Sequence, residues 1–261
     1  MVLPIHDENP TRRTPWITYL LIAINVFVFL QEPIGRLSVA GAPTLTQACR
    51  QEAFFRRYAA IPRELTSGEQ LPLTVGAAEP PDSCQVVAPS YTKAPALSVL
   101  QSMFLHGGWL HLLGNMLFLF VFGNNVEDRL GRLAYLAFYV VCGFAATYVF
   151  AFSDRNSVTT VVGASGAIAG VLGGYLVLFP RVRVLSLVPF LFFLPFRLPA
   201  WLVLGSWFLL QYMYSRGAAM TSGSDVAYLA HVAGFVFGFL VLWLLRRRLA
   251  PPRSASYGRP A

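Results

Sequence analysis

Four polar residues in apolar stretches of this 261-residue chain have types and spacings that suit acyl transfer. His111 and Asn115 are four residues apart, so on a helix both side chains lie on one face. Ser165 lies in the turn Gly163-Ala164-Ser165-Gly166, which would present its hydroxyl at a helix N-terminus. Free backbone N–H groups there face any negative charge that develops nearby. His231, in a later apolar stretch, offers an imidazole as a general base.

A serine beside a neutral imidazole is an activated nucleophile, because the histidine takes the hydroxyl proton during attack. The apolar stretches that hold these residues contain no Asp or Glu to orient the imidazole, and Asp225, six residues before His231, is a poor candidate. The sequence therefore predicts a Ser165–His231 dyad. The side chains of His111 and Asn115 and the N–H of Ser165 would form the oxyanion hole. Hydrolysis by this set needs no metal and no cofactor.

Two stripes of small residues would bring the serine and the base together. Small residues at every fourth position let membrane helices approach closely. The first stripe is Gly166, Gly170 and Gly174, and the second is Ala230, Gly234 and Gly238. If the stripes face each other, Ser165 and His231 meet. Both stripes also fit ordinary packing seams, and His111 with Asn115 also fits a pair of structural interhelical hydrogen bonds. His106 lies about 140° away from the face of His111, so we expect it to be structural.

The composition indicates a membrane protein. Hydrophobic residues make up 56% of the chain, and charged residues only 12%, against about 25% in an average soluble domain. This excludes an ordinary soluble enzyme, a disordered chain and a nucleic-acid-binding domain, although the net charge is +8. The bilayer is thus the expected environment.

Apolar runs predict an all-α, polytopic fold with six membrane-spanning helices, since a span needs about 20 apolar residues. We expect spans at 16–30, 96–122, 133–152, 161–179, 198–214 and 226–245. Prolines interrupt the stretch before the fifth span, so residues 184–197 are expected to form an interfacial piece or a hairpin. A long outer loop, 32–95, would connect the first two helices.

Arginine positions predict the orientation. Six spans place twelve arginines in the tails and loops of one side and two in the short loops of the other. Positive residues favour the cytoplasmic side, so both termini are expected there, in the cell (inner) membrane. The predicted parts are a tail at 1–14, a six-helix core at 15–247 and a tail at 248–261. His111, Ser165 and His231 then lie near the outer face.

The outer loop is expected to hold a short helix at 47–61, either interfacial or solvated. Cys49 and Cys84 both lie in this loop. Because the outer compartment is oxidising, a disulfide between them is a candidate, with two free thiols as the alternative. Cys142 is expected to be a buried thiol.

Three motifs together resemble the rhomboid intramembrane serine proteases of bacterial type. They are His106-Gly-Gly-Trp-Leu-His111-Leu-Leu-Gly-Asn115, Gly163-Ala-Ser165-Gly166 and Ala230-His231-Val-Ala-Gly234-Phe-Val-Phe-Gly238. The resemblance covers residues 10–247. It implies a six-helix core, Ser165 as nucleophile, His231 as base, and His111 with Asn115 at the oxyanion. It also implies cleavage of transmembrane protein substrates, which enter from the lipid bilayer beside the fifth helix under a cap at 215–225.

The chain departs from the family pattern at two places. Its outer loop contains no tryptophan, and Ala169 stands where some members place an aromatic residue against the catalytic histidine. Another group must therefore hold the His231 ring. One alternative is a non-catalytic rhomboid-like protein that binds membrane clients; such proteins typically lack the serine or the histidine, and this chain has both. The other alternative is a transporter, for which an inverted repeat would be expected.

Overall fold

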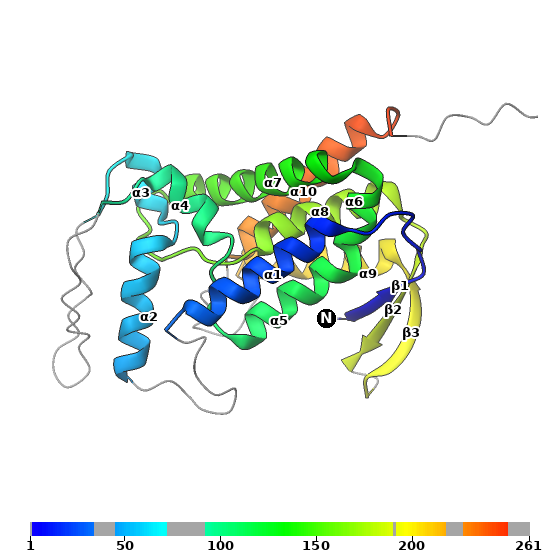
Figure 1. Ribbon diagram of the computed structural model, residues 1–261, viewed down its shortest axis with the longest axis horizontal. Helices are drawn as coiled ribbons and strands as arrows, with labels where there is room; N and C mark the ends of the chain where they lie inside the picture. The colour runs from blue at the N-terminus through cyan, green and yellow to red at the C-terminus, as the bar shows by residue number, and fades with distance from the viewer. Residues whose placement is uncertain (1, 34–44, 72–91, 190–191, 218–226, 250–261) are drawn as a thin grey trace, which may run out of the picture.

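The computed structural model describes residues 2–33, 45–71, 92–189, 192–217 and 227–249 (Figure 1). The helices of these segments are α1 (Trp16–Gln31), α2 (Leu45–Tyr58), α3 (Pro62–Ser67), α4 (Pro95–Ser102), α5 (Trp109–Phe118), the π-helix η1 (Leu119–Gly123), α6 (Asn124–Leu130), α7 (Arg132–Ser153), α8 (Ser165–Leu178), α9 (Ala200–Ser215) and α10 (Tyr228–Leu245). The strands are β1 (Leu3–Asp7), β2 (Arg183–Val188) and β3 (Leu194–Pro199).

Long apolar helices make this a membrane protein. Within the described segments, three helical stretches are long and apolar enough to cross a bilayer: Trp109–Leu130, Arg132–Ser153 and Tyr228–Leu245. The helices α1 and α8 are apolar but shorter. Large apolar side chains such as Phe27 and Leu133 face outward, with 65% and 82% of their surface exposed. Helices that are apolar on all sides suit a lipid environment.

The expected helix at 96–122 begins where α4 does, but it is wrong in its middle and at its C-terminal end. The structure ends α4 at Ser102 and begins α5 at Trp109, then continues through η1 and α6 to Leu130. Gly107 and Gly108 lie in the break, where their low helix propensity favours an irregular backbone. The segment after Phe122 lies outside the expected span. It is helical in the structure, where Asn125 and Glu127 are buried in contacts with β1 and α1.

Glu127 is the main one of these contacts. Its carboxylate accepts hydrogen bonds from the backbone N–H groups of Ile17 and Thr18 and from the Thr18 hydroxyl, at 2.8–3.0 Å. These N–H groups belong to the first turn of α1, which has no side-chain cap of its own. A carboxylate at a helix N-terminus also interacts favourably with the helix dipole. α6 therefore caps α1.

The centre of the bundle is α8, which packs against α7 and α10 (Figure 1). Nine of its residues are buried, from Ala167 to Tyr175 without a break. A β-carbon on Gly234 would overlap the carbonyl oxygen of Gly166, and one on Gly238 would overlap that of Gly170. The two small-residue stripes therefore lie face to face. Gly173 adds a third close approach, to the backbone of Phe235.

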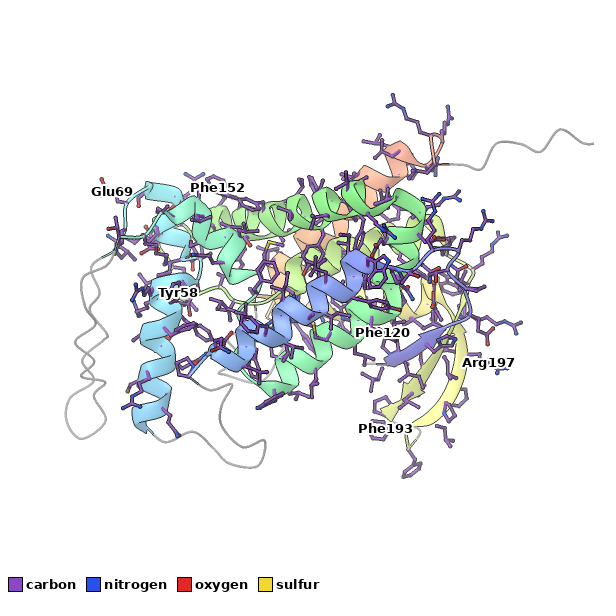
Figure 2. All side chains as sticks on the ribbon, viewed as in Figure 1. Tyr58, Glu69, Phe120, Phe152, Phe193 and Arg197 are labelled. Atoms are coloured by element: carbon purple, nitrogen blue, oxygen red, sulfur yellow. The ribbon has the colours of Figure 1, made fainter. Side chains whose placement is uncertain are left out.

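A small sheet makes the all-α expectation wrong in part. β1, β2 and β3 form an antiparallel sheet in that order, with Leu3 opposite Leu187 and Val184 opposite Leu198. β2 and β3 form a hairpin, which is one of the two forms expected for 184–197. Figure 2 shows Phe193 and Arg197 on this hairpin, pointing away from the helices. β1 falls in the expected N-terminal tail.

Asp7, at the end of β1, attaches the sheet to the helices. Its Oδ2 accepts hydrogen bonds from the Asn125 amide at 2.8 Å and from the Tyr175 hydroxyl at 2.7 Å. Burial raises the pKa of the Asp7 carboxyl. β1 is thus held to both α6 and α8 at the end of α8 that is distant from Ser165.

The segment around α2 and α3 covers the other end of the bundle. α2 forms where a short helix was expected, and it stands across the direction of the long helices in Figure 1. Lys93 Nζ and Glu64 Oε2 form a buried ion pair at 2.6 Å. Cys49 is buried on α2, and Cys142 is a buried free thiol. Cys84 lies outside the described residues, so the Cys49–Cys84 bridge stays a prediction.

Candidate active site

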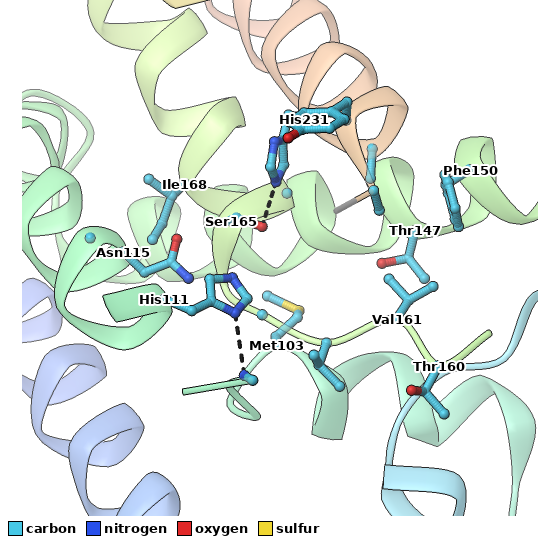
Figure 3. Close-up of a pocket in the computed structure, with 18 of the residues that line it drawn as sticks. Met103, His111, Asn115, Thr147, Phe150, Thr160, Val161, Ser165, Ile168 and His231 are labelled. Carbon is cyan, nitrogen blue, oxygen red and sulfur yellow. Dashed lines mark hydrogen bonds between the residues drawn. The ribbon is translucent and has the colours of Figure 1, made fainter. Parts of the chain in front are cut away.

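A cavity of about 1290 Å³ opens between α5, α8, α9 and α10. His111, Asn115, Ser165 and His231 all line it (Figure 3). Residues far apart in the sequence therefore face one space. Both apolar and polar side chains form the wall, which is typical of sites that bind a peptide or small molecule.

Ser165 occupies the first position of α8, so its backbone N–H has no partner within the helix. The turn before it depends on Gly163, which has a φ of 121°. A side chain is strained at that φ. A β-carbon there would also lie 2.9 Å from the Nε2 of His111. The glycine therefore allows both the turn and the close approach of His111 to the serine.

His231 lies beside Ser165. Its Nε2 is 2.7 Å from the Ser165 Oγ (Figure 3). Its Nδ1 is 2.7 Å from the Oε1 of Gln211 on α9. An amide oxygen can only accept a hydrogen bond. Nδ1 therefore carries the proton, and Nε2 is the acceptor for the serine hydroxyl. A serine and an imidazole in this arrangement can act as nucleophile and general base.

Gln211 is a site residue that the sequence reasoning missed. Its side chain is 6% exposed, and it is the one amide or charged residue in the sequence of α9. A lone long polar side chain in an apolar helix is itself a signal, because polar groups in spanning segments need a partner.

His111 presents a second ring nitrogen to the same place. The backbone N–H of Gly107 donates to the His111 Nδ1 at 3.3 Å. Nδ1 is then the bare nitrogen, and Nε2 carries the proton. Nε2 lies over Gly163, next to Ser165. His111 is therefore a donor that faces the serine.

Asn115 supplies a further donor. Its side chain is buried, and its Nδ2 has no hydrogen-bond partner among the described residues. Buried amide groups are normally hydrogen-bonded, so an unpaired amide that borders a cavity needs an explanation. A ligand oxygen in the cavity would satisfy it.

His106 lies outside this set. It is fully buried between α4 and α5, and its backbone N–H donates to the Glu32 Oε1 at 2.9 Å. Its ring packs edge-on against His111, with 5.2 Å between ring centroids. It therefore supports His111 from behind. Asp225 and most of the expected cap at 215–225 lie outside the described residues.

Apolar helices around a serine–histidine pair define a polytopic membrane protein with a candidate hydrolytic site. A family model of the rhomboid domain matches residues 94–248, more than half of the chain. The chain belongs to the rhomboid family.

Curated relatives are similar to parts of the chain. "RHOMBOID-like protein 5" of Arabidopsis thaliana is 37% identical over 30% of this chain and 25% of its own length. "Rhomboid protein 1, mitochondrial" of Saccharomyces cerevisiae is 28% identical over 60% of this chain and 44% of its own. "Putative rhomboid protease YdcA" of Bacillus subtilis is 37% identical over 30% of this chain and 39% of its own. The chain thus spans less than half the length of each of these relatives.

Proposed function

We propose that this protein is an intramembrane serine endopeptidase that hydrolyses peptide bonds in or near the transmembrane segments of other membrane proteins. The observation that carries the proposal is the 2.7 Å contact between Ser165 Oγ and His231 Nε2 in a cavity among apolar helices. Membership of the rhomboid family supports it. So does one relative that is named as a putative rhomboid protease.

In the proposed mechanism, Ser165 Oγ attacks the carbonyl carbon of the substrate while its proton passes to His231 Nε2. The carbonyl oxygen becomes negative and accepts hydrogen bonds from the Ser165 N–H, the His111 Nε2–H and the Asn115 amide. His231 then gives its proton to the departing amine as the C–N bond breaks. Water then loses a proton to His231 and attacks the acyl carbon. As the C–O bond to Ser165 breaks, His231 returns that proton to the Oγ, which restores both side chains. This sequence uses only groups of the chain and water.

We also propose that six helical stretches span the membrane. They are α1, the continuous stretch α5–η1–α6, and α7, α8, α9 and α10. The distribution of arginines supports a core at 15–247, with the tails 1–14 and 248–261 on the cytoplasmic side of a cell (inner) membrane. The loop 32–95 and the cavity would then lie near the outer face. Some relatives have mitochondrial or chloroplastic names, so the membrane in which this protein resides also has to be tested.

Mutation of the proposed dyad tests the function. The substrate is a single-pass transmembrane reporter, co-reconstituted with the full chain in liposomes, and the measurement is the rate of product formation. Ser165→Ala and His231→Ala should each reduce cleavage to background, because both act in one step. The double variant should be no worse than either single one. Ser206→Ala, which removes a serine of α9 that bonds to Val203 O, is the matched control and should keep the parent rate.

A fluorophosphonate probe gives a second readout. It should label the parent protein but not Ser165→Ala. Cleavage by Ser165→Ala at the parent rate would reject the assignment. A parent protein that binds the reporter, leaves it intact and resists the probe would instead be a client-binding member of the family.

A further inference from the structure

Gln211 lies against the candidate base. Its Oε1 is 2.7 Å from the Nδ1 of His231. Ser165 Oγ, His231 and Gln211 therefore form a continuous line of hydrogen bonds across α8, α10 and α9. The sequence leaves open which group holds the His231 ring, because Ala169 offers no aromatic face.

We propose that Gln211 is a positioning residue of the hydrolytic site, which fixes the tautomer and the ring plane of His231. The inference rests on the proposed function. With Nδ1 protonated by its bond to the amide oxygen, Nε2 is bare and can take the proton of Ser165. In the opposite tautomer, Nε2 would donate to the serine, and the base would be lost. The neutral amide holds the tautomer and orientation of this ring, as the carboxylate of a Ser-His-Asp triad does for its histidine.

Aromatic rings complete the enclosure of His231. Trp207, one helical turn before Gln211 on α9, lies 6.0 Å from the His231 ring between centroids. Tyr228 on α10 meets the ring edge-on at 6.3 Å. Apolar and aromatic neighbours limit how far the ring tilts, but neither ring contact selects a tautomer. That selection falls to the Gln211 Oε1, which accepts from Nδ1.

The first test compares Gln211→Leu with Gln211→Glu. Leucine has a similar volume but accepts no hydrogen bond, whereas an ionised glutamate can only accept one. Removal of the orienting carboxylate of a triad costs about 10⁴-fold in kcat. A neutral amide should matter less, so we expect Gln211→Leu to lose about 10- to 100-fold in kcat with KM within about twofold. Gln211→Glu should recover most of that loss.

The pH–rate profile is a readout that a merely structural role would not move. A carboxylate beside Nδ1 stabilises the imidazolium, so the base stays protonated to a higher pH. The acid limb of the Gln211→Glu profile should therefore shift to higher pH than in the parent. Among the residues that the structure describes, the other titratable groups that face the ring are His111 on α5 and Tyr228 on α10, and both variants retain them.

Tyr212→Phe is the matched control, because it removes a polar group from the next position of α9, on an exposed side chain. Its kcat and profile should match the parent. If Gln211→Leu keeps the parent kcat, or changes KM alone, the inference is overturned. It is also overturned if Gln211→Glu is folded, by its thermal transition in detergent, and has the parent profile. If the Ser165→Ala variant still cleaves the reporter at the parent rate, the proposed function is overturned instead.

Discussion

At the scale of single residues, Asn115 gives the clearest test of the proposed mechanism. Its side-chain amide borders the cavity and donates to no group among the described residues, although it is buried. An unpaired buried donor costs free energy unless a ligand satisfies it. In the proposed mechanism, that ligand is the oxyanion, which appears only during the reaction.

We therefore predict that Asn115→Ala lowers kcat by about 10²-fold and leaves KM nearly unchanged, because one oxyanion donor is lost and others remain. Steady-state cleavage of the transmembrane reporter measures both constants. Leu113→Ala, on the exposed side of the same helix, is the control and should keep the parent kcat. A change in KM alone would show that Asn115 binds the substrate and not the transition state.

The residue scale is also where sequence reasoning reached furthest. His111, Asn115, Ser165 and His231 were named from their types and spacings, and the structure places all four on one cavity. Helical periodicity explains this, since it fixes which residues share a face and a height. Gln211 was missed because no sequence pattern aligns its position on α9 with His231, unlike the two small-residue stripes of α8 and α10. The register of α9 against α10 depends on side-chain packing, which one sequence does not reveal.

At the scale of elements, the contact between α8 and α10 positions the serine against the base. Backbone lies directly on backbone at Gly166 and Gly234, with no room for a β-carbon. Overpacking a tight site typically costs about 1–3 kcal/mol. Here it would also move His231 relative to Ser165, so stability and activity should fall together.

We predict that Gly234→Ala lowers the thermal transition in detergent and reduces cleavage, and that Gly234→Leu does both more strongly. Gly205→Ala on α9 is the matched control, because a β-carbon there meets nothing within 4 Å. This control should keep its activity and gain slightly in stability from helix propensity. Parent turnover in Gly234→Leu would contradict the packing argument.

The cap that α6 provides to α1 gives a second element-scale prediction. Glu127→Ala leaves two N–H groups and one hydroxyl unpaired in a buried place. Each unpaired group costs about 1–3 kcal/mol, so we expect a loss of at least about 2 kcal/mol in the free energy of unfolding. Glu127→Gln keeps one acceptor oxygen and should lose less. Denaturant titration followed by circular dichroism measures both, and equal stability of all three proteins would reject the cap.

At the scale of the whole molecule, the parts that escaped prediction are those that join distant segments. β1 pairs with β2 across about 180 residues of chain, and its five residues have no pattern that separates them from a tail. The polar stretch in α6 has the composition of a loop, but the structure makes it helical and pairs Glu127 with α1 and Asn125 with β1. Local propensity is overridden at these places by tertiary contacts.

The end of the molecule that carries α2 is held by a buried carboxylate. Glu32, just after α1, is fully buried and accepts hydrogen bonds from the His106 N–H and from the Gln51 Nε2 on α2, each at 2.9 Å. Burial is the main cause that raises the pKa of Glu32 to about 7. The folded protein therefore binds a proton between about pH 4.5 and 7 that the unfolded chain has released. Stability must then fall as the pH rises through this window.

We predict that Glu32→Gln removes this slope, because an amide keeps the shape of the side chain and has no charge to bury. Thermal unfolding in detergent should give nearly equal midpoints for variant and parent near pH 4.5. The variant should become more stable toward pH 8, by at most about 3 kcal/mol for a shift of this size. Glu52→Gln, at a half-exposed ion pair on α2, is the control and should show the parent slope. Parallel curves for Glu32→Gln and the parent would show that the carboxylate is stabilised by its hydrogen bonds as well as it is in water.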